Sequence, residues 1–190
     1  LDNIFLSYFF TTFCLLIVIN GSNFIDGLNG LVLGYYGTIL ILIFKLDLIN
    51  NLNINENDFT YFIYLIFCLF LFNIFDQLYI GDSGAYLLGF IVGFFLIMIY
   101  KTNETISPFF IVLLLWYPCF ENLFSIMRKF KFKKSPTFPD TKHLHQLLFH
   151  FIKKKYLKES LFSNNLASFS ILLYNMIIFV LASNYINNTQ

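Results

Sequence analysis

The sequence predicts an all-α fold, a polytopic bundle of membrane helices, and two observations support this class. Of the 190 residues, 58% are hydrophobic and only 12% are charged, which is more apolar than a soluble domain of this size can bury. Long apolar runs also alternate with short polar segments, and a bilayer core about 30 Å thick needs roughly 20 mostly apolar residues per helix. We therefore expect about six transmembrane helices.

The predicted helices follow six apolar runs: residues 4–19, 28–44, 59–75, 85–100, 108–124 and 166–186. The net charge of +1 excludes the basic surface of a nucleic-acid-binding protein, so the lipid bilayer is the expected environment. We expect residues 1–190 to form one integral-membrane domain. Because the sequence starts at Leu1 without a basic segment or a signal peptide, we also expect its N-terminal part to be missing.

The charges predict which side of the membrane each loop occupies. Ten of the 12 basic residues lie between residues 128 and 158, so we expect residues 125–165 to form a cytoplasmic loop. An apolar stripe inside this loop predicts a helix lying at the membrane interface, and it consists of Leu144, Leu147, Leu148, Phe151, Ile152 and Tyr156. Counting helices back from this loop places segments 20–29 and 76–84 on the same side and segments 45–58 and 101–107 outside. The polar segments of the chain are thus expected at one face.

The first polar segment, residues 20–30, reads Asn-Gly-Ser-Asn-Phe-Ile-Asp-Gly-Leu-Asn-Gly. Asn20, Asn23, Asp26 and Asn29 recur at every third position, so a helix would carry them on one face. Such a stripe between membrane helices is costly unless something binds it, which indicates a ligand site. The alternative is a turn with helix caps.

The second polar segment, residues 79–85, reads Tyr-Ile-Gly-Asp-Ser-Gly-Ala and directly precedes an apolar helix. The N–H groups at a helix N-terminus suit a phosphate, and the carboxylate of Asp82 suits Mg²⁺. The alternative is that Asp82 only caps the helix. The glycine pairs that follow the two segments, Gly30 with Gly34 and Gly89 with Gly93, predict close helix packing.

The third polar segment extends from Arg128 to His150. Its basic run is either a topology signal touching anionic lipid or a set of substrate contacts. Asp140 is the expected N-cap of the following helix, near His143 and His145. Two histidines two positions apart would not share a helix face, so we expect anion contacts from them rather than a zinc pair. Upstream of this segment, Glu121 follows Pro118, and we expect the carboxylate to orient Arg128.

In order and spacing, the three segments resemble the motifs of the polyprenyl-phosphate N-acetylhexosamine-1-phosphate transferases, or glycosyltransferase family 4. Residues 20–31 are similar to the family's Asn-x-x-Asn-x-x-Asp-Gly-x-Asp/Asn-Gly-Leu motif. Residues 80–84 are similar to Phe-x-Gly-Asp-x-Gly-Ser, with Ala85 in place of the serine, and residues 135–145 to Ser-Pro-x-x-x-Asp-x-x-His-x-His. The resemblance covers essentially the whole chain and corresponds to the C-terminal part of a family member.

The resemblance implies transfer of a sugar 1-phosphate from a UDP-N-acetylhexosamine to a polyprenyl (undecaprenyl) phosphate, with release of UMP. It places the active face at the cytoplasmic side of a bacterial inner membrane and the product in cell-wall, lipopolysaccharide or O-antigen synthesis. The implied cofactor is Mg²⁺, with Mn²⁺ as a substitute, and a homodimer is left open.

The resemblance also implies a role for each site residue. Asp26, Asp82 and His143 are the implied catalytic residues, and Asp82 is the implied metal ligand. The residues implied to bind the substrates are Asn20, Asn23, Asn29, Gly81, Ser83, Gly84, Arg128, Asp140 and His145. The family's acidic pair on an earlier cytoplasmic loop has no counterpart in this sequence, so we expect the chain to supply part of a catalytic site.

Two other functions remain open from the sequence. An ion-coupled membrane transporter would have broken helices with polar groups near the membrane midplane, whereas the polar segments here are expected at one face. A non-catalytic truncated or degenerate copy would fit the absence of the acidic pair.

The charge distribution makes a prediction about topology. Cysteines introduced at Lys133 and Asn53, in a variant without native cysteines, should react with an impermeant maleimide from opposite sides of the membrane, cytoplasmic and external respectively. Labelling of intact cells and inverted vesicles measures this. Reaction of both positions from the same side would contradict the predicted arrangement.

Overall fold

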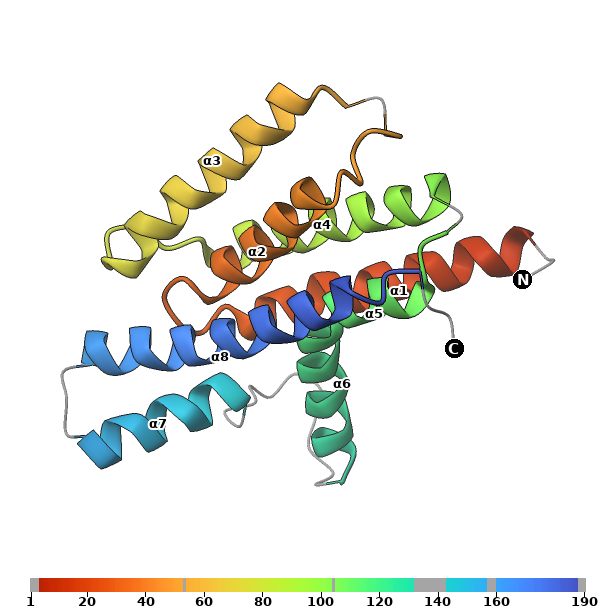
Figure 1. Ribbon diagram of the computed structural model, residues 1–190. Coiled ribbons are helices and arrows are strands. Elements are labelled where there is room, and N and C mark those ends of the chain that lie inside the picture. The colour runs from red at the N-terminus through yellow and green to blue at the C-terminus, as the bar shows by residue number, and fades with distance from the viewer. Residues whose placement is uncertain (1–3, 53, 104, 132–142, 157–159, 188–190) are drawn as a thin grey trace.

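The computed structural model describes residues 4–52, 54–103, 105–131, 143–156 and 160–187. Four positions named above, Leu1, Asn53, Lys133 and Asp140, lie outside the described residues. The described part of the chain is helical and contains no strand, which confirms the all-α fold class (Figure 1). Its helices are α1 (Ile4–Ile25), α2 (Leu31–Lys45), α3 (Glu56–Ile74), α4 (Gly81–Thr102), α5 (Pro108–Leu114), α6 (Trp116–Lys131), α7 (Leu144–Tyr156) and α8 (Ser160–Ser183).

The number of membrane-spanning helices is smaller than the six predicted. Within the described residues, α1, α3, α4 and α8 are long and apolar enough to cross a bilayer. Helices α5 and α6 meet at a bend of 71° and give a fifth span if they are counted together. The sixth apolar run is α2, whose 15 residues reach only about 22 Å. The prediction of six spans was wrong because the polar turn next to this apolar run takes up part of it. The helix is therefore shorter than the run, and the sequence alone does not show by how much.

Helix α2 is a core helix. Its residues Tyr35, Tyr36, Ile39, Leu40 and Ile43 are fully buried, and the helix contacts α1, α3, α4 and α8 (Figure 1). The Tyr35 hydroxyl donates to the backbone oxygen of Leu114 at 2.8 Å, so the first core tyrosine also holds the end of α5. A helix enclosed by others does not need to match the bilayer thickness with its own apolar surface.

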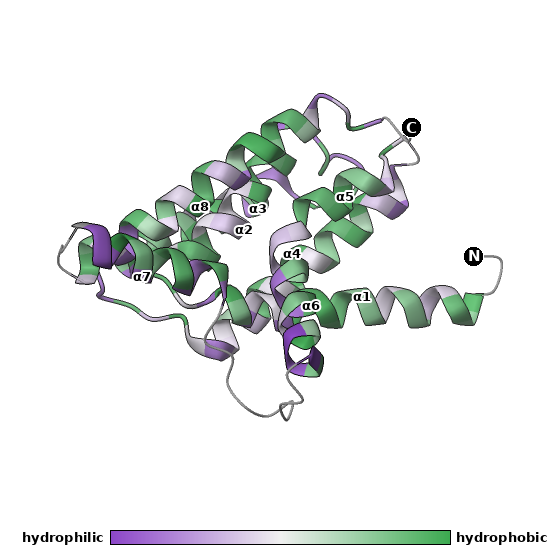
Figure 2. Ribbon diagram, turned by 90° about the horizontal axis from the view of Figure 1, so that it is seen from below, coloured by the Kyte–Doolittle hydropathy of each residue, from purple (hydrophilic) through white to green (hydrophobic). Residues whose placement is uncertain are grey.

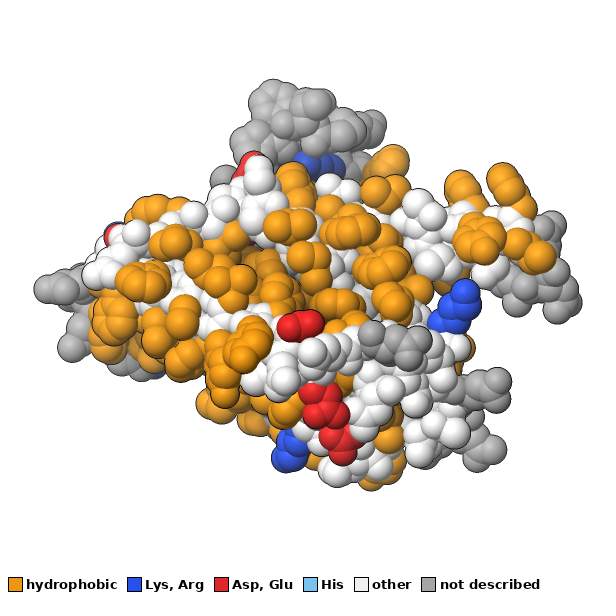
Figure 3. All heavy atoms as spheres, turned by 90° about the horizontal axis from the view of Figure 1, so that it is seen from above, with side chains coloured by type: hydrophobic (Ala, Val, Ile, Leu, Met, Phe, Trp, Pro, Cys, Tyr) orange, Lys and Arg blue, Asp and Glu red, His pale blue; other side chains and the backbone are white. Residues whose placement is uncertain are grey.

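The outer surface is apolar, as expected for a protein that lies in a membrane. On α1, Phe5, Phe9 and Phe13 are 80%, 65% and 53% exposed, and Figure 3 shows hydrophobic side chains over most of the face viewed from above. A soluble monomer rarely exposes a contiguous apolar surface of this extent. Hydrophilic residues gather instead on α6 and α7 (Figure 2), whose last turns carry basic residues. The protein is therefore a multi-pass membrane protein.

The C-terminal half of α1 is packed tightly between α4 and α6. A Cβ atom at Gly89 of α4 would lie 2.2 Å from the Ser22 hydroxyl oxygen. A Cβ atom at Gly21 would lie 2.2 Å from the backbone oxygen of Pro118 in α6. The predicted close packing at Gly89 is therefore confirmed, whereas the contact at Gly21 was not expected. These two contacts set the distance of α4 and α6 from the end of α1.

The contact at Gly21 can be tested by adding one methyl group. Gly21→Ala should lower the unfolding free energy by about 1–3 kcal/mol, the usual cost of overpacking, because the backbone of Pro118 cannot move aside as a flexible side chain can. Thermal unfolding in detergent measures the effect. Gly37→Ala is the matched control, since its Cβ would lie 3.5 Å from the Ile66 side chain and alanine favours a helix. Equal stability of the two variants would contradict the tight contact.

Candidate functional site

The three polar segments meet at the C-terminal end of α1. The Asn23 side-chain amide donates to the Tyr86 hydroxyl of α4 at 3.1 Å. On the other side, the Phe24 ring stacks on the His143 imidazole with centroids 5.2 Å apart. A Cβ atom at Gly27 would lie 2.2 Å from Nε2 of His145, so only glycine allows this imidazole to approach. The first segment therefore contacts both of the others.

Asp26 and Asp82 are the two carboxylates of this junction. Asp26 follows the last residue of α1 and is half-buried, whereas Asp82 is exposed in the first turn of α4. Burial raises the pKa of the Asp26 carboxyl above its ordinary value, and the nearby negative charge of Asp82 raises this pKa further. The two acids are thus close enough to repel each other. A cation between them would remove this repulsion.

Helix α4 begins without a side-chain cap. Its N-cap residue is Ile80, which makes no side-chain capping hydrogen bond, so Asp82 does not occupy the N-cap position that the alternative interpretation gives it. Gly81 has a φ of +65° and open space where a Cβ atom would lie, and Gly81 and Ser83 are exposed. The first backbone N–H groups of α4 therefore have no side-chain cap, and this position suits an anion.

Glu121 and His143 form a buried pair next to this junction. The Nδ1 atom of His143 lies 2.8 Å from Oε2 of Glu121, and the backbone N–H of Leu144 donates to Oε1 at 2.8 Å. The expectation that Glu121 orients Arg128 is corrected by these contacts, because α7 brings its own N-terminus to α6. Arg128 lies over the Phe124 ring, with its guanidinium carbon 4.8 Å from the ring centroid.

The two imidazoles lie together, which the sequence analysis did not expect. Their rings are stacked, with centroids 5.6 Å apart and an interplanar angle of 6°. His143 precedes the first residue of α7, so the rule about shared helix faces does not apply to the pair. His145 is 1% exposed, and its Nδ1 atom is buried without a hydrogen-bond partner. Burial, and secondly the neighbouring His143, lowers the pKa of His145 from 6.5 to about 4. His145 is therefore neutral at physiological pH.

A network of asparagines holds the first segment to the end of α3 and to α8. The Asn29 side-chain amide donates to Asp76 at 3.0 Å, and the Asn29 backbone N–H donates to the Asn164 side chain at 2.8 Å. The Gly30 backbone N–H donates to the side chain of Asn73. Asn29 thus uses both its side chain and its backbone N–H in hydrogen bonds within the protein. Its role in substrate binding is implied only by the resemblance to the family.

Sequence reasoning missed several members of this network. The Asn165 amide donates to the backbone oxygen of Ile74 at 3.1 Å, and the hydroxyl of Tyr79 donates to Asp76 at 2.6 Å. Hydrogen bonds from Tyr79 and from Asn29 lower the pKa of Asp76 below its ordinary value. The one available signal was the position of these asparagines at the ends of apolar runs, where a polar residue in a membrane helix suggests a structural or functional role.

The remaining predicted residues have simpler surroundings. Asn20 is exposed, and its amide donates to the backbone oxygen of Leu16 at 3.0 Å within α1. Gly84 is half-buried. Among the described residues, no group of three or more histidines, cysteines and acids is arranged to hold a metal ion.

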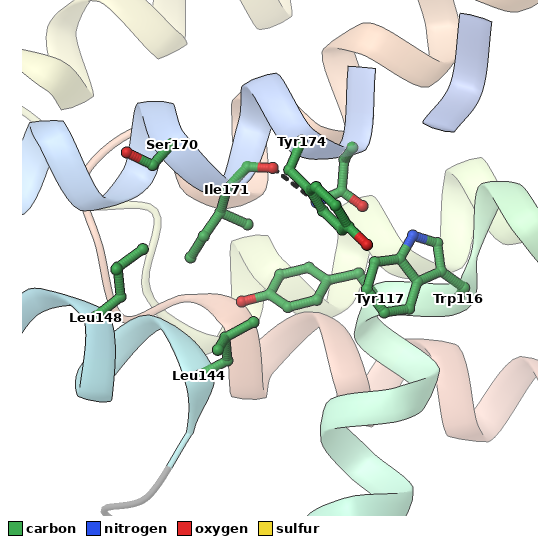
Figure 4. A pocket seen from close by; sticks show the side chains of 8 residues that line it. Trp116, Tyr117, Leu144, Leu148, Ser170, Ile171 and Tyr174 are labelled. Carbon is green, nitrogen blue, oxygen red and sulfur yellow. Dashed lines mark hydrogen bonds between the residues drawn. The ribbon is translucent and has the colours of Figure 1, made fainter. Parts of the chain in front are cut away.

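A small cavity lies beside the Glu121–His143 pair, between α6, α7 and α8 (Figure 4). Its volume is about 180 Å³, and its lining is mostly apolar. Leu144, the residue that follows His143, forms part of the wall together with Leu148 and Ile171. The Tyr117 hydroxyl and the Asn175 side-chain oxygen also belong to the lining and have no hydrogen-bond partner.

Fold and site together define a multi-pass helical membrane protein with a polar junction at the loop ends of its helices. Residues 2–100 match the family model described as glycosyl transferase family 4, and the chain belongs to this family. The matched region includes the first two polar segments, whereas the third lies beyond it.

The chain is also similar to an undecaprenyl-phosphate alpha-N-acetylglucosaminyl 1-phosphate transferase of Thermotoga maritima. The two sequences are 29% identical over 131 residues, which cover 68% of this chain and 39% of the relative. The chain thus matches well under half of the relative's length. No solved structure matches the chain.

The neutral state of His145 makes a prediction about pH. Between pH 6.5 and about 4, the unfolded chain binds a proton at this position that the folded chain does not. The contribution of the neutral His145 ring to the free energy of unfolding is therefore at its maximum above pH 6.5. It falls by up to about 3 kcal/mol as the pH decreases toward 4. His145→Gln should flatten this part of the stability profile, measured by thermal unfolding in detergent, with His150→Gln on the same helix as the control. An unchanged profile in His145→Gln would show that another group carries the acid sensitivity.

Proposed function

We propose that the protein takes part in transferring a sugar 1-phosphate from a UDP-N-acetylhexosamine to a polyprenyl phosphate, with release of UMP. The observation that carries the proposal is the meeting of the three polar segments at the end of α1, where the charge of Asp82 is near enough to raise the pKa of Asp26. Family membership and the name of the Thermotoga relative support the same class of reaction. An ion-coupled transporter is disfavoured, because the polar groups gather at helix ends.

The reaction joins two anionic groups and therefore needs positive charge. A phosphate oxygen of the lipid attacks the sugar-linked phosphorus, the bond from this phosphorus to the bridging oxygen breaks, and UMP leaves with that oxygen. Asp82 and Asp26 would hold Mg²⁺, or Mn²⁺ as a substitute, because hard oxygen ligands suit both ions. The ion would supply charge neutralisation at the diphosphate. Holding a cation suits Asp26 and Asp82, because it would remove the repulsion between the two carboxylates.

The chain's own residues suit the remaining tasks. The uncapped first turn of α4, with Gly81, Ser83 and Gly84, offers N–H groups and a hydroxyl to the diphosphate. Asn20 and Asn23 present side-chain amides on the same junction for the nucleotide, and Arg128 adds a positive charge further along α6. The mostly apolar cavity beside Leu144 would suit the first part of the lipid chain.

The proposal concerns the protein that contains both this chain and the family's earlier acidic pair. By the positive-inside rule the site faces the cytoplasm of a bacterial inner membrane. The product would serve as a lipid-linked precursor for cell-wall or surface-polysaccharide synthesis, including lipopolysaccharide or O-antigen.

Asp82 provides the test of the proposed chemistry. In the full-length protein, Asp82→Asn should lower kcat by at least ~10²-fold, the scale expected when one electrostatic contact to the transition state is lost. Release of UMP from UDP-N-acetylglucosamine in proteoliposomes containing undecaprenyl phosphate measures the rate, with and without Mg²⁺.

Asp58→Asn is the matched control, since Asp58 is an exposed acid in the first turn of α3. Near-normal turnover of Asp82→Asn would contradict the proposed role of Asp82. No turnover in the unmodified full-length protein would favour a non-catalytic copy.

A further inference from the structure

Glu121 is the one buried side chain among the acids that the structure describes, with 2% of its surface exposed. An isolated carboxylate in such a place is costly, so its hydrogen bonds must compensate for lost hydration. The contacts described above use both oxygens, one for the backbone N–H of Leu144 and one for the His143 ring. A residue needed only to cap α7 would use a single oxygen.

The two contacts also determine which ring nitrogen of His143 carries a proton. An ionised carboxylate only accepts hydrogen bonds. Because Oε2 faces Nδ1 of His143 at 2.8 Å, that nitrogen is the donor and carries the hydrogen. The atom left for another partner is Nε2. The ring cannot easily turn away, because it stacks on both Phe24 and His145.

The position of Glu121 itself is set by the contact between α1 and α6. The amide of Asn122, the next residue, donates to the backbone oxygen of Ile17 at 3.1 Å. One turn earlier, Pro118 lies against Gly21. Glu121 therefore stands at a fixed place relative to the end of α1, where Asp26 lies.

We propose that Glu121 is a positioning residue of the transferase reaction. It holds His143 in the Nδ1–H form and so directs Nε2 toward the phosphate groups that react. This inference rests on the proposed function. It adds a residue of α6 to the site and explains why His143, which precedes α7, has a defined ring orientation. Neighbouring His145 is neutral and supports the ring by stacking.

The test uses the difference between a carboxylate and an amide. In Glu121→Gln the single side-chain oxygen can keep the bond from Leu144, and the NH₂ group then faces His143 Nδ1 and forces the proton onto Nε2. We expect the ¹⁵N NMR signals of His143, in labelled protein in nanodiscs, to change from the Nδ1–H to the Nε2–H pattern. We expect kcat to fall by ~10²-fold or more, as when the partner of a catalytic histidine is made neutral, with KM and the melting temperature nearly unchanged.

Glu121→Asp is the conservative variant. It keeps two acceptor oxygens and loses one methylene, so it should retain the Nδ1–H pattern and a kcat within ~10-fold of the unmodified protein, since proximity effects of this kind are graded. This variant keeps the proposal testable if the glutamine variant does not fold. An Nε2–H pattern in Glu121→Asp would overturn the proposal.

The outcomes separate this inference from the proposed function. An unchanged tautomer or an unchanged kcat in Glu121→Gln would overturn the positioning role, and so would a loss of folding stability without any change in tautomer. An unmodified full-length protein without transferase activity would instead overturn the proposed function. The NMR measurement needs no turnover and would still decide whether Glu121 sets the His143 ring.

Discussion

The approach of α1 to both α4 and α6 is the constraint on which the site depends. In a membrane, helices gain little from burying apolar side chains, because lipid is equally apolar, so close backbone contact and hydrogen bonding carry more of the association. Gly21 provides this contact against the backbone of Pro118, and Gly89 provides it against the small side chain of Ser22. As a result, α4 with Asp82, α6 with Glu121 and the start of α7 with its histidines all come to the end of α1.

The polar groups at this junction are largely satisfied by one another. Asn29, Asn73, Asp76 and Asn164 bond across three segments that are far apart in the chain. An unpaired backbone or amide group at the edge of a bilayer would cost free energy. Because the network gives these groups hydrogen-bond partners, the connections between the helices can be short. It also leaves Asp82 and the first turn of α4 open to solvent, which separates the residues that hold the fold from those that can meet a substrate.

Three acids of the described residues differ in their surroundings. Asp76 is stabilised as an anion by hydrogen bonds, which lower its pKa. Asp26 has a raised pKa because of burial and the charge of Asp82, which is the arrangement expected of carboxylates that share a cation. Glu121 is buried but fully engaged by a ring nitrogen and a backbone N–H. Both of its oxygens are therefore used within the protein.

The sequence by itself determined the all-α membrane class, the approximate place of each helix and the family motifs, because apolar periodicity and short polar patterns are local properties of a chain. It did not determine that α2 is a short core helix, since enclosure by α3, α4 and α8 depends on contacts between distant segments. It also gave Glu121 the wrong partner. Arg128 is close to Glu121 along the chain, whereas His143 reaches it only when the start of α7, which packs against α8, meets α6. Hydrogen bonds between helices depend on the distances between the helices, which residues such as Gly21 set. Only the tertiary structure decided these distances.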